Sequence, residues 1–302
     1  MQPNGAGSEY ALDADLVVAA SGRSGRVPAW LEELGYALPP EDRLQIDLMY
    51  ASRRLRLQAS ALGGDKAILV GPRPGRLRGL GLIAQEGNHW LLTLFGYGAA
   101  DRPPTDENAY LEFAATVAPP DVLAAIRDAE PLDEIVTHAF PANQRRRYEQ
   151  LKRFPDGLLV VGDAISSFNP IYGQGMSVAA LEAMALRQCL ARGEQRIAHR
   201  FFRAGAKVVD HAWEMAIGAD LALPEIEGRR PLSVRVANAY TERLLRVAER
   251  DPVVAAAFND VCDMLAPPQH VLRPNVAWRV LRGNLRGGRS AGEPATAAPT
   301  AL

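Results

Sequence analysis

GLLVVGDAISSFNPIYGQGM, which occupies residues 157–176, contains the strongest structural signal in the chain. The apolar run Leu158–Val161 predicts a buried parallel strand that ends at Gly162. Asp163 follows at the carboxyl end of this strand, which is where open α/β sheets bind their ligands. Further along, Gly175–Ala191 is strongly apolar and long enough for a helix. The segment therefore predicts a strand, a loop and a long helix of an α/β domain.

The loop between this strand and this helix has the residue types of a ligand site. Pro170 stiffens the loop, and Gly173 and Gly175 flank Gln174 at the start of the helix. Glycine lets the backbone approach a ligand closely, and a helix N-terminus offers N–H groups and partial positive charge. A planar ring that gathers negative charge on reduction would be stabilised there, and the Asp163 carboxylate can accept hydrogen bonds from sugar-like hydroxyls. A glycine pair alone fits any strand-to-helix turn, but the whole ordered string favours a ligand site.

This ordered string resembles the second FAD motif of the aromatic-hydroxylase-like flavoprotein monooxygenases, and it is most similar to the branch containing bacterial polyether epoxidases. The resemblance extends over residues 15–26, the middle sheet and the phrase FPANQRRRY at 140–148. It implies FAD as the cofactor, with NAD(P)H as a candidate electron donor. It also implies that Asp163 binds the ribityl chain, that Pro170 flanks the isoalloxazine ring and that the 173–176 backbone faces the pyrimidine edge. The implied cofactor-binding residues are Gly162, Asp163, Pro170, Gly173, Gln174, Gly175 and Met176.

Two features depart from the family pattern. The family begins with a βαβ unit that carries Gly-x-Gly-x-x-Gly and holds the FAD pyrophosphate, and the sequence contains no such unit. We therefore expect a truncated chain, through a missequenced gene, a wrong start codon or a natural truncation. A separate chain is one candidate source of the missing unit. Residues 20–26, ASGRSGR, resemble the family's middle motif, but Ser21 replaces the usual Asp and Gly25 takes the usual Ser position. This stretch fits either a cofactor contact or an ordinary turn after a strand.

The rest of the chain completes an α/β prediction with α+β character: a partial Rossmann-like FAD-binding domain, an antiparallel sheet and a helical C-terminal region. Asp15–Ala20 predicts a second parallel strand, and Pro28 predicts a short helix over residues 29–34. Apolar runs between Leu44 and Phe95 predict an antiparallel sheet, because the connections are too short for helical crossovers. Ile135–Phe140 is a further candidate strand. Helices are expected over residues 105–117 with Thr105 as the N-cap, 122–129, 195–218, 231–250, 252–265 and 274–283.

The predicted organisation has five parts. These are a partial FAD-binding domain over residues 1–43, an antiparallel-sheet substrate domain over 44–150, the Gly-Asp motif with its helix over 151–192, a helical region over 193–285 and a disordered tail over 286–302.

Composition excludes several classes of function. The 302 residues include 34 basic and 35 acidic side chains, so no net charge draws the protein to nucleic acid. The two cysteines lie far apart in apolar patterns, which fits a reducing cytoplasm, and the five histidines lack metal-ligand spacing. No apolar run is long enough to span a bilayer. The apolar faces of the C-terminal helices are interpreted as core or a dimer face, and membrane contact is not expected. Arg145–Arg147 is interpreted as a solvated helix face.

The functional hypothesis is an FAD-dependent oxidoreductase, a monooxygenase or epoxidase that acts on a hydrophobic small molecule. The flavin carries such chemistry, so no catalytic side chain is assigned. Tyr50, Trp90 and Phe95 are candidates for the substrate pocket, although core packing is favoured for them. One alternative is a non-catalytic fragment or one half of a two-chain flavoprotein. Another is a flavin-dependent reductase of isoprenoid double bonds.

Overall fold

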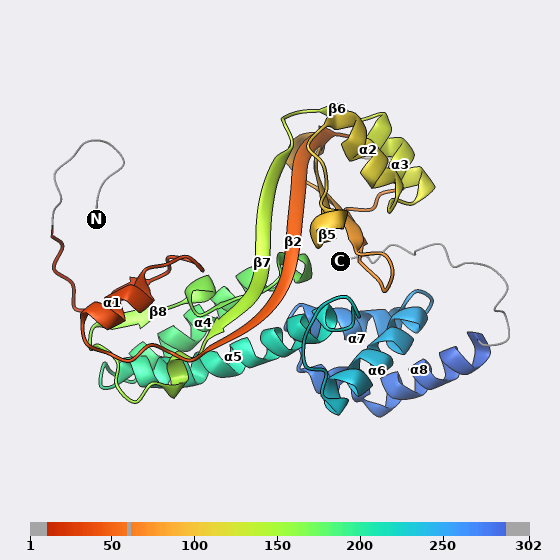
Figure 1. Ribbon diagram of the computed structural model, residues 1–302. Coiled ribbons are helices and arrows are strands. Elements are labelled where there is room, and N and C mark those ends of the chain that lie inside the picture. The colour runs from red at the N-terminus through yellow and green to blue at the C-terminus, as the bar shows by residue number, and fades with distance from the viewer. Residues whose placement is uncertain (1–10, 59–61, 288–302) are drawn as a thin grey trace. The chain divides into compact units, whose positions relative to one another are not determined.

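The computed structural model describes residues 11–58 and 62–287, which form a mixed α/β structure (Figure 1). This confirms the predicted fold class. Backbone contacts divide the chain into two units, residues 1–42 with 144–212 and residues 43–143 with 213–302. Most of the predicted tail, residues 288–302, lies outside the described residues. Its first two residues, 286 and 287, belong to the last helix. The five predicted domain boundaries stay a prediction.

The first unit contains the two predicted parallel strands. β1 (Val17–Ala19) pairs in parallel with β8 (Leu158–Val160), as the apolar runs indicated. α1 (Val27–Glu33) begins two residues earlier than expected, and α4 (Gly175–Leu190) agrees with the prediction at its start. Aromatic rings fill the core of this unit: the Phe202 ring lies 5.3 Å from that of Tyr148 and 4.9 Å from that of Phe154, centroid to centroid.

The long antiparallel sheet is confirmed in its position and its pairing. Its order is β3-β4-β5-β2-β7-β9, and β6 pairs with β2. Every pairing of β5 is antiparallel, as is that of β3 with β4. The strands are β2 (Glu41–Arg56), β3 (Ala67–Val70), β4 (Arg78–Ala84), β5 (His89–Tyr97), β6 (Glu130–Pro131), β7 (Val136–Arg146) and β9 (Ser166–Ser167).

Two helices pack on this sheet and bury its apolar residues. They are α2 (Glu107–Ala115) and α3 (Pro120–Arg127). The Tyr110 side chain lies in the core, and its hydroxyl donates to the carbonyls of Ala51 and Leu92, both at 3.2 Å. Trp90 belongs to the same core, and Phe95 is also buried beside Tyr50, with 5.9 Å between ring centroids. The preference for core packing of these three aromatics is confirmed.

The C-terminal helices form as the periodicity predicted. They are α5 (Ile197–Asp220), α6 (Leu232–Ala248), α7 (Pro252–Cys262) and α8 (Pro274–Gly287). The last three share a small core that contains Leu244, Val254 and Val276. Cys189 and Cys262 are thiols rather than a disulfide. Among the described helices, none combines the length and the apolarity needed to cross a bilayer.

Two local predictions were wrong. The N-cap of α2 is Asp106 rather than Thr105, because the extended Asp106 backbone lets its Oδ1 accept the Ala109 N–H at 3.0 Å. The arginine run does not lie on a solvated helix face. β7 continues through Arg146, and Arg145 has only 1% of its surface exposed, with the Asp210 carboxylate 2.6 Å from its Nη1.

Candidate functional site

The candidate site begins where β1 and β8 end together. The Val17 N–H donates to the Gly157 carbonyl at 2.7 Å, and the Val161 N–H donates to the Ala19 carbonyl at 3.1 Å. Because the two strands are parallel, their carboxyl ends lie at the same edge of the small sheet. The loop over residues 20–26 and the Gly-Asp turn therefore leave the sheet side by side. The structure brings the two sequence motifs together at this edge.

The Gly-Asp turn presents one carboxylate to solvent. Gly162 has φ = +66°, a left-handed value that favours glycine, and begins a 3-10 turn, η4 (Gly162–Ala164). The Ile165 N–H closes this turn on the Gly162 carbonyl at 2.8 Å. Asp163 is exposed, and its Oδ2 accepts a hydrogen bond from the Ser167 hydroxyl at 3.1 Å. A carboxylate accepts at several lone pairs, so Asp163 retains capacity for hydroxyl donors of a ligand.

A second turn leads into α4. It begins with η5 (Pro170–Tyr172), where the buried Asn169 accepts the Ile171 N–H on its Oδ1 at 3.1 Å. Gly173 follows with φ = +68° and donates its N–H to the Pro170 carbonyl at 3.0 Å. Gln174 is the N-cap residue and is buried under the turn, and no side chain of the described residues caps the helix. The first N–H groups of α4 are therefore left for solvent or a ligand.

The space above these glycines is open. A Cβ atom built on Gly162, Gly173 or Gly175 would have no heavy atom of the described structure within 4 Å. Pro170 and Met176 are exposed beside this space. Six of the seven predicted site residues thus lie at an accessible surface, and Gln174 lies beneath it. A flat ligand can reach the backbone here without displacing a side chain, so the cradle fits the isoalloxazine ring that the sequence implied.

Sequence reasoning missed two charged residues that contact this site, one fully buried and one partly buried. Glu182 on α4 is fully buried, and its Oε2 accepts the Gly162 N–H at 2.6 Å. Burial raises the pKa of Glu182 to about 7; the Gly162 hydrogen bond lowers this pKa and the nearby Asp163 charge raises it. The available signal was that Glu182 is the one acidic residue among the sixteen of α4. The second missed residue is Arg146, whose guanidinium contacts both loops.

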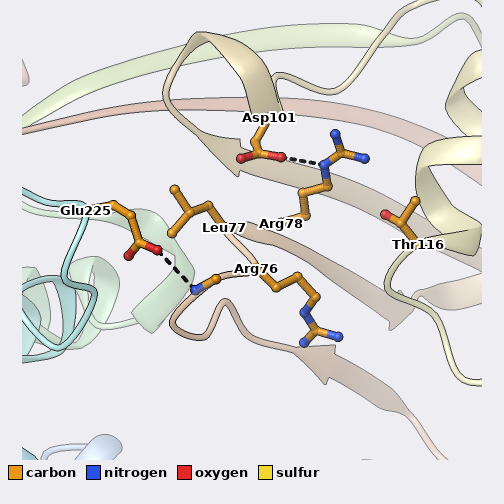
Figure 2. Close-up of a pocket in the computed structure, with 7 residues that line it drawn as sticks. Arg76, Leu77, Arg78, Asp101, Thr116 and Glu225 are labelled. Atoms are coloured by element: carbon orange, nitrogen blue, oxygen red, sulfur yellow. Dashed lines mark hydrogen bonds and ion pairs between the residues drawn. The ribbon is translucent and has the colours of Figure 1, made fainter.

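The second unit contains a hollow of a different character (Figure 2). It encloses about 410 Å³ and is lined by Gly75, Arg76, Leu77, Arg78, Asp101, Thr116 and Glu225. Its charges are partly compensated, because Arg78 Nε lies 2.6 Å from the Asp101 carboxylate. The Glu225 carboxylate accepts the Gly75 N–H at 3.0 Å. This polar lining does not match an apolar substrate pocket. Within residues 11–58 and 62–287, no group of three or more His, Cys, Asp or Glu side chains is placed to hold a metal ion.

Several solved structures share this fold, among them a flavin-dependent brominase, a flavoprotein/dehydrogenase and a protein solved with FAD. The flavin-dependent brominase Bmp2 has a TM-score of 0.59 at 12% identity, over 94% of this chain and 66% of its own. A flavoprotein/dehydrogenase from Cytophaga hutchinsonii has a TM-score of 0.56 at 14% identity, and the match covers 91% of this chain and 62% of that structure. Klebsiella pneumoniae HpxO, solved with FAD and uric acid, has a TM-score of 0.50 at 17% identity, and the match covers 90% of this chain and 61% of that structure. At these identities the likeness shows that the fold is shared.

One curated protein is similar in sequence. Protein Rv3254 of Mycobacterium tuberculosis (strain ATCC 25618 / H37Rv) is 37% identical over 284 residues, a match that covers 92% of this chain and 59% of that protein. The chain thus spans about three fifths of the length of this relative. No family model matches the chain.

Proposed function

We propose that the protein is an FAD-dependent oxidoreductase in which residues 162–176 form one wall of the flavin site. The observation that supports this most is the open space over Gly173 and Gly175, next to an exposed carboxylate at the end of a parallel strand. The fold shared with flavin-dependent enzymes agrees with this function.

Each residue of the wall has a separate role in the proposal. Asp163 accepts hydrogen bonds from the ribityl hydroxyls, and Gly162 gives its turn the required backbone conformation. Pro170 lies against the ring, and the backbone from Gly173 to Met176 meets the pyrimidine edge, where the α4 N-terminus favours negative charge. Gln174 is the buried residue between the two glycines. When bound, FAD supplies electron transfer between a nicotinamide donor, oxygen and substrate.

For the reaction, we propose oxygenation or epoxidation of a hydrophobic small molecule with NAD(P)H as the donor. The experiment follows NAD(P)H oxidation and oxygen uptake of the flavin-loaded protein with hydrophobic phenols and alkenes. Oxygen uptake that rises with substrate and yields a product one oxygen atom heavier agrees with the proposal. Substrate-dependent NAD(P)H oxidation without oxygen uptake would indicate the alternative, a reductase of isoprenoid double bonds.

A second candidate has its own structural support: a polypeptide that holds the flavin end of FAD and relies on an additional α/β segment for the adenylate end. Parallel sheets are normally covered on both faces, yet β1 exposes 50% of Val17 and 43% of Val18 in a two-stranded sheet. Met176 and Met184 are exposed on α4 of the same unit. We propose that a dinucleotide-binding α/β segment, on a separate chain, covers these residues. In that case the chain by itself is non-catalytic.

A further inference from the structure

Arg146 makes three contacts that join separate parts of the candidate site. It is the last residue of β7, and its side chain is 12% exposed. Its Nη1 donates to the Ala164 carbonyl at 3.2 Å, and its Nη2 donates to the Arg23 carbonyl at 3.1 Å. Its own backbone N–H donates to the Ile165 carbonyl at 2.8 Å. One residue thus holds the Gly-Asp turn and the 20–26 loop at the same time.

Glu182 holds the same turn at its other end. Its carboxylate accepts the Gly162 N–H, whereas Arg146 donates to the Ala164 carbonyl, and Asp163 is the residue between these two peptide groups. A guanidinium can only donate, and the Oε2 oxygen of Glu182 accepts, so each side chain matches the backbone group that it meets. Hydrogen bonds to charged partners are stronger than neutral ones. The turn is therefore fixed by side chains at both ends.

We propose that Arg146 and Glu182 are positioning residues that hold Asp163 in place, and that Arg146 also couples the Gly-Asp turn to the 20–26 loop as one preformed surface. The proposal deepens the flavin assignment and rests on it for the identity of the ligand. It gives the 20–26 loop a role in the site despite the Ser21 replacement, because its backbone carbonyl at Arg23 is what Arg146 contacts.

The coupling requires arginine at this position. The planar guanidinium presents several N–H groups in a fixed fork, so that it reaches two carbonyls from different loops at once. A lysine would keep the charge, but its single ammonium on a flexible stem would hold one loop at the expense of the other. The neighbouring Arg147 differs, because its guanidinium pairs with carboxylates. Asp42 lies at 2.6 Å, Asp210 at 3.3 Å and Glu149 at 3.5 Å.

The test compares wild type, Arg146→Gln, Arg146→Lys and the matched control Arg147→Gln. Amide hydrogen exchange is measured on peptides that cover residues 20–26 and 162–168, and riboflavin and FAD dissociation constants are measured by fluorescence. We expect exchange in both peptides to be about tenfold faster in Arg146→Gln, and the flavin dissociation constant to rise by about tenfold. Arg146→Lys should loosen at least one loop, and Arg147→Gln should change neither loop nor flavin affinity by more than about twofold.

Exchange that is unchanged in both loops of Arg146→Gln would overturn the proposal, as would equal acceleration in Arg147→Gln. If Arg146→Gln exchanges rapidly throughout the first unit, that variant is unfolded there, and the folded Arg146→Lys variant decides the question. Unchanged exchange in both loops of Arg146→Lys would overturn the proposal. The flavin assignment has its own test. If the wild-type protein binds neither riboflavin nor FAD, the proposed ligand is wrong, but the exchange results still decide whether Arg146 couples the two loops.

Discussion

Asp163 is the single side chain that the proposed function assigns to the ribityl hydroxyls. It is exposed, with Ser167 donating to one of its oxygens, so its removal should leave the fold intact. We expect Asp163→Ala to weaken flavin binding by about 1–3 kcal/mol, because ligand hydroxyls would lose their acceptor. The measurement is a fluorescence titration with FAD. Asp156→Ala, an exposed carboxylate seven residues earlier, is the control, and equal affinities of the two variants would contradict the role of Asp163.

Gly175 allows stability and ligand affinity to be separated at one residue. It is the first residue of α4 and has open space where a Cβ would lie, and its φ is not positive. Gly175→Ala should raise the free energy of unfolding by up to about 1 kcal/mol, because alanine loses less entropy in a helix. The same methyl group would enter the space proposed for the ring, so flavin affinity should fall.

Gly173→Ala is the matched variant for this prediction. Its left-handed backbone makes a Cβ costly by roughly 1–2 kcal/mol, so it should lower both stability and affinity. Urea unfolding and flavin titration of the two variants distinguish the effects. A Gly175→Ala protein that binds flavin as tightly as wild type would show that the ring lies elsewhere.

At the level of the element, the contact between α4 and the Gly-Asp turn should be sensitive to pH. Burial raises the Glu182 pKa from 4.5 to about 7, so the folded state binds an extra proton between these values. The contribution of Glu182 to the free energy of unfolding is therefore complete below pH 4.5. This contribution decreases as the pH rises through about 7, by about 3 kcal/mol at most. Glu182→Gln keeps an acceptor for Gly162 but does not titrate. Its stability relative to wild type should increase from pH 5 to pH 8 in urea unfolding, and parallel pH curves would contradict this explanation.

The elements were predictable where the signal is local. β3 agrees to the residue with the run Ala67–Val70, because this short apolar run is bounded by polar and turn residues. The Gly-Asp and Gly-Gln-Gly turns could be recognised because glycine, proline and a helix start occur in a fixed order. The N-cap was misplaced by one residue because Thr105 and Asp106 are both good caps, and only the backbone conformation selects between them.

The supporting residues were not predictable because their partners are distant in sequence. Arg145 is buried and pairs with a carboxylate 65 residues later, and three adjacent arginines give no sign of this. Glu182 meets an amide 20 residues earlier, and Arg146 meets a carbonyl 123 residues earlier. Pattern and composition describe one element at a time, whereas these roles depend on how elements pack against each other.

At the level of the whole molecule, the proposed function assigns residues to the isoalloxazine ring and the ribityl chain, and it assigns none to the adenylate. The chain by itself should therefore bind riboflavin, FMN and FAD with affinities within about threefold of each other, a difference below 1 kcal/mol. Parallel titrations of the three flavins check this. A preference for FAD of a hundredfold or more would show that the chain carries its own adenylate site and would remove the need for a separate α/β segment.

The place where flavin binds is the central question, and hydrogen exchange with and without saturating flavin answers it most directly. We expect slower exchange on binding in peptides that cover residues 20–26 and 162–178, with the peptides of α6, α7 and α8 unchanged. Flavin binding that leaves residues 162–178 unprotected, or that protects only residues of the second unit, would contradict it.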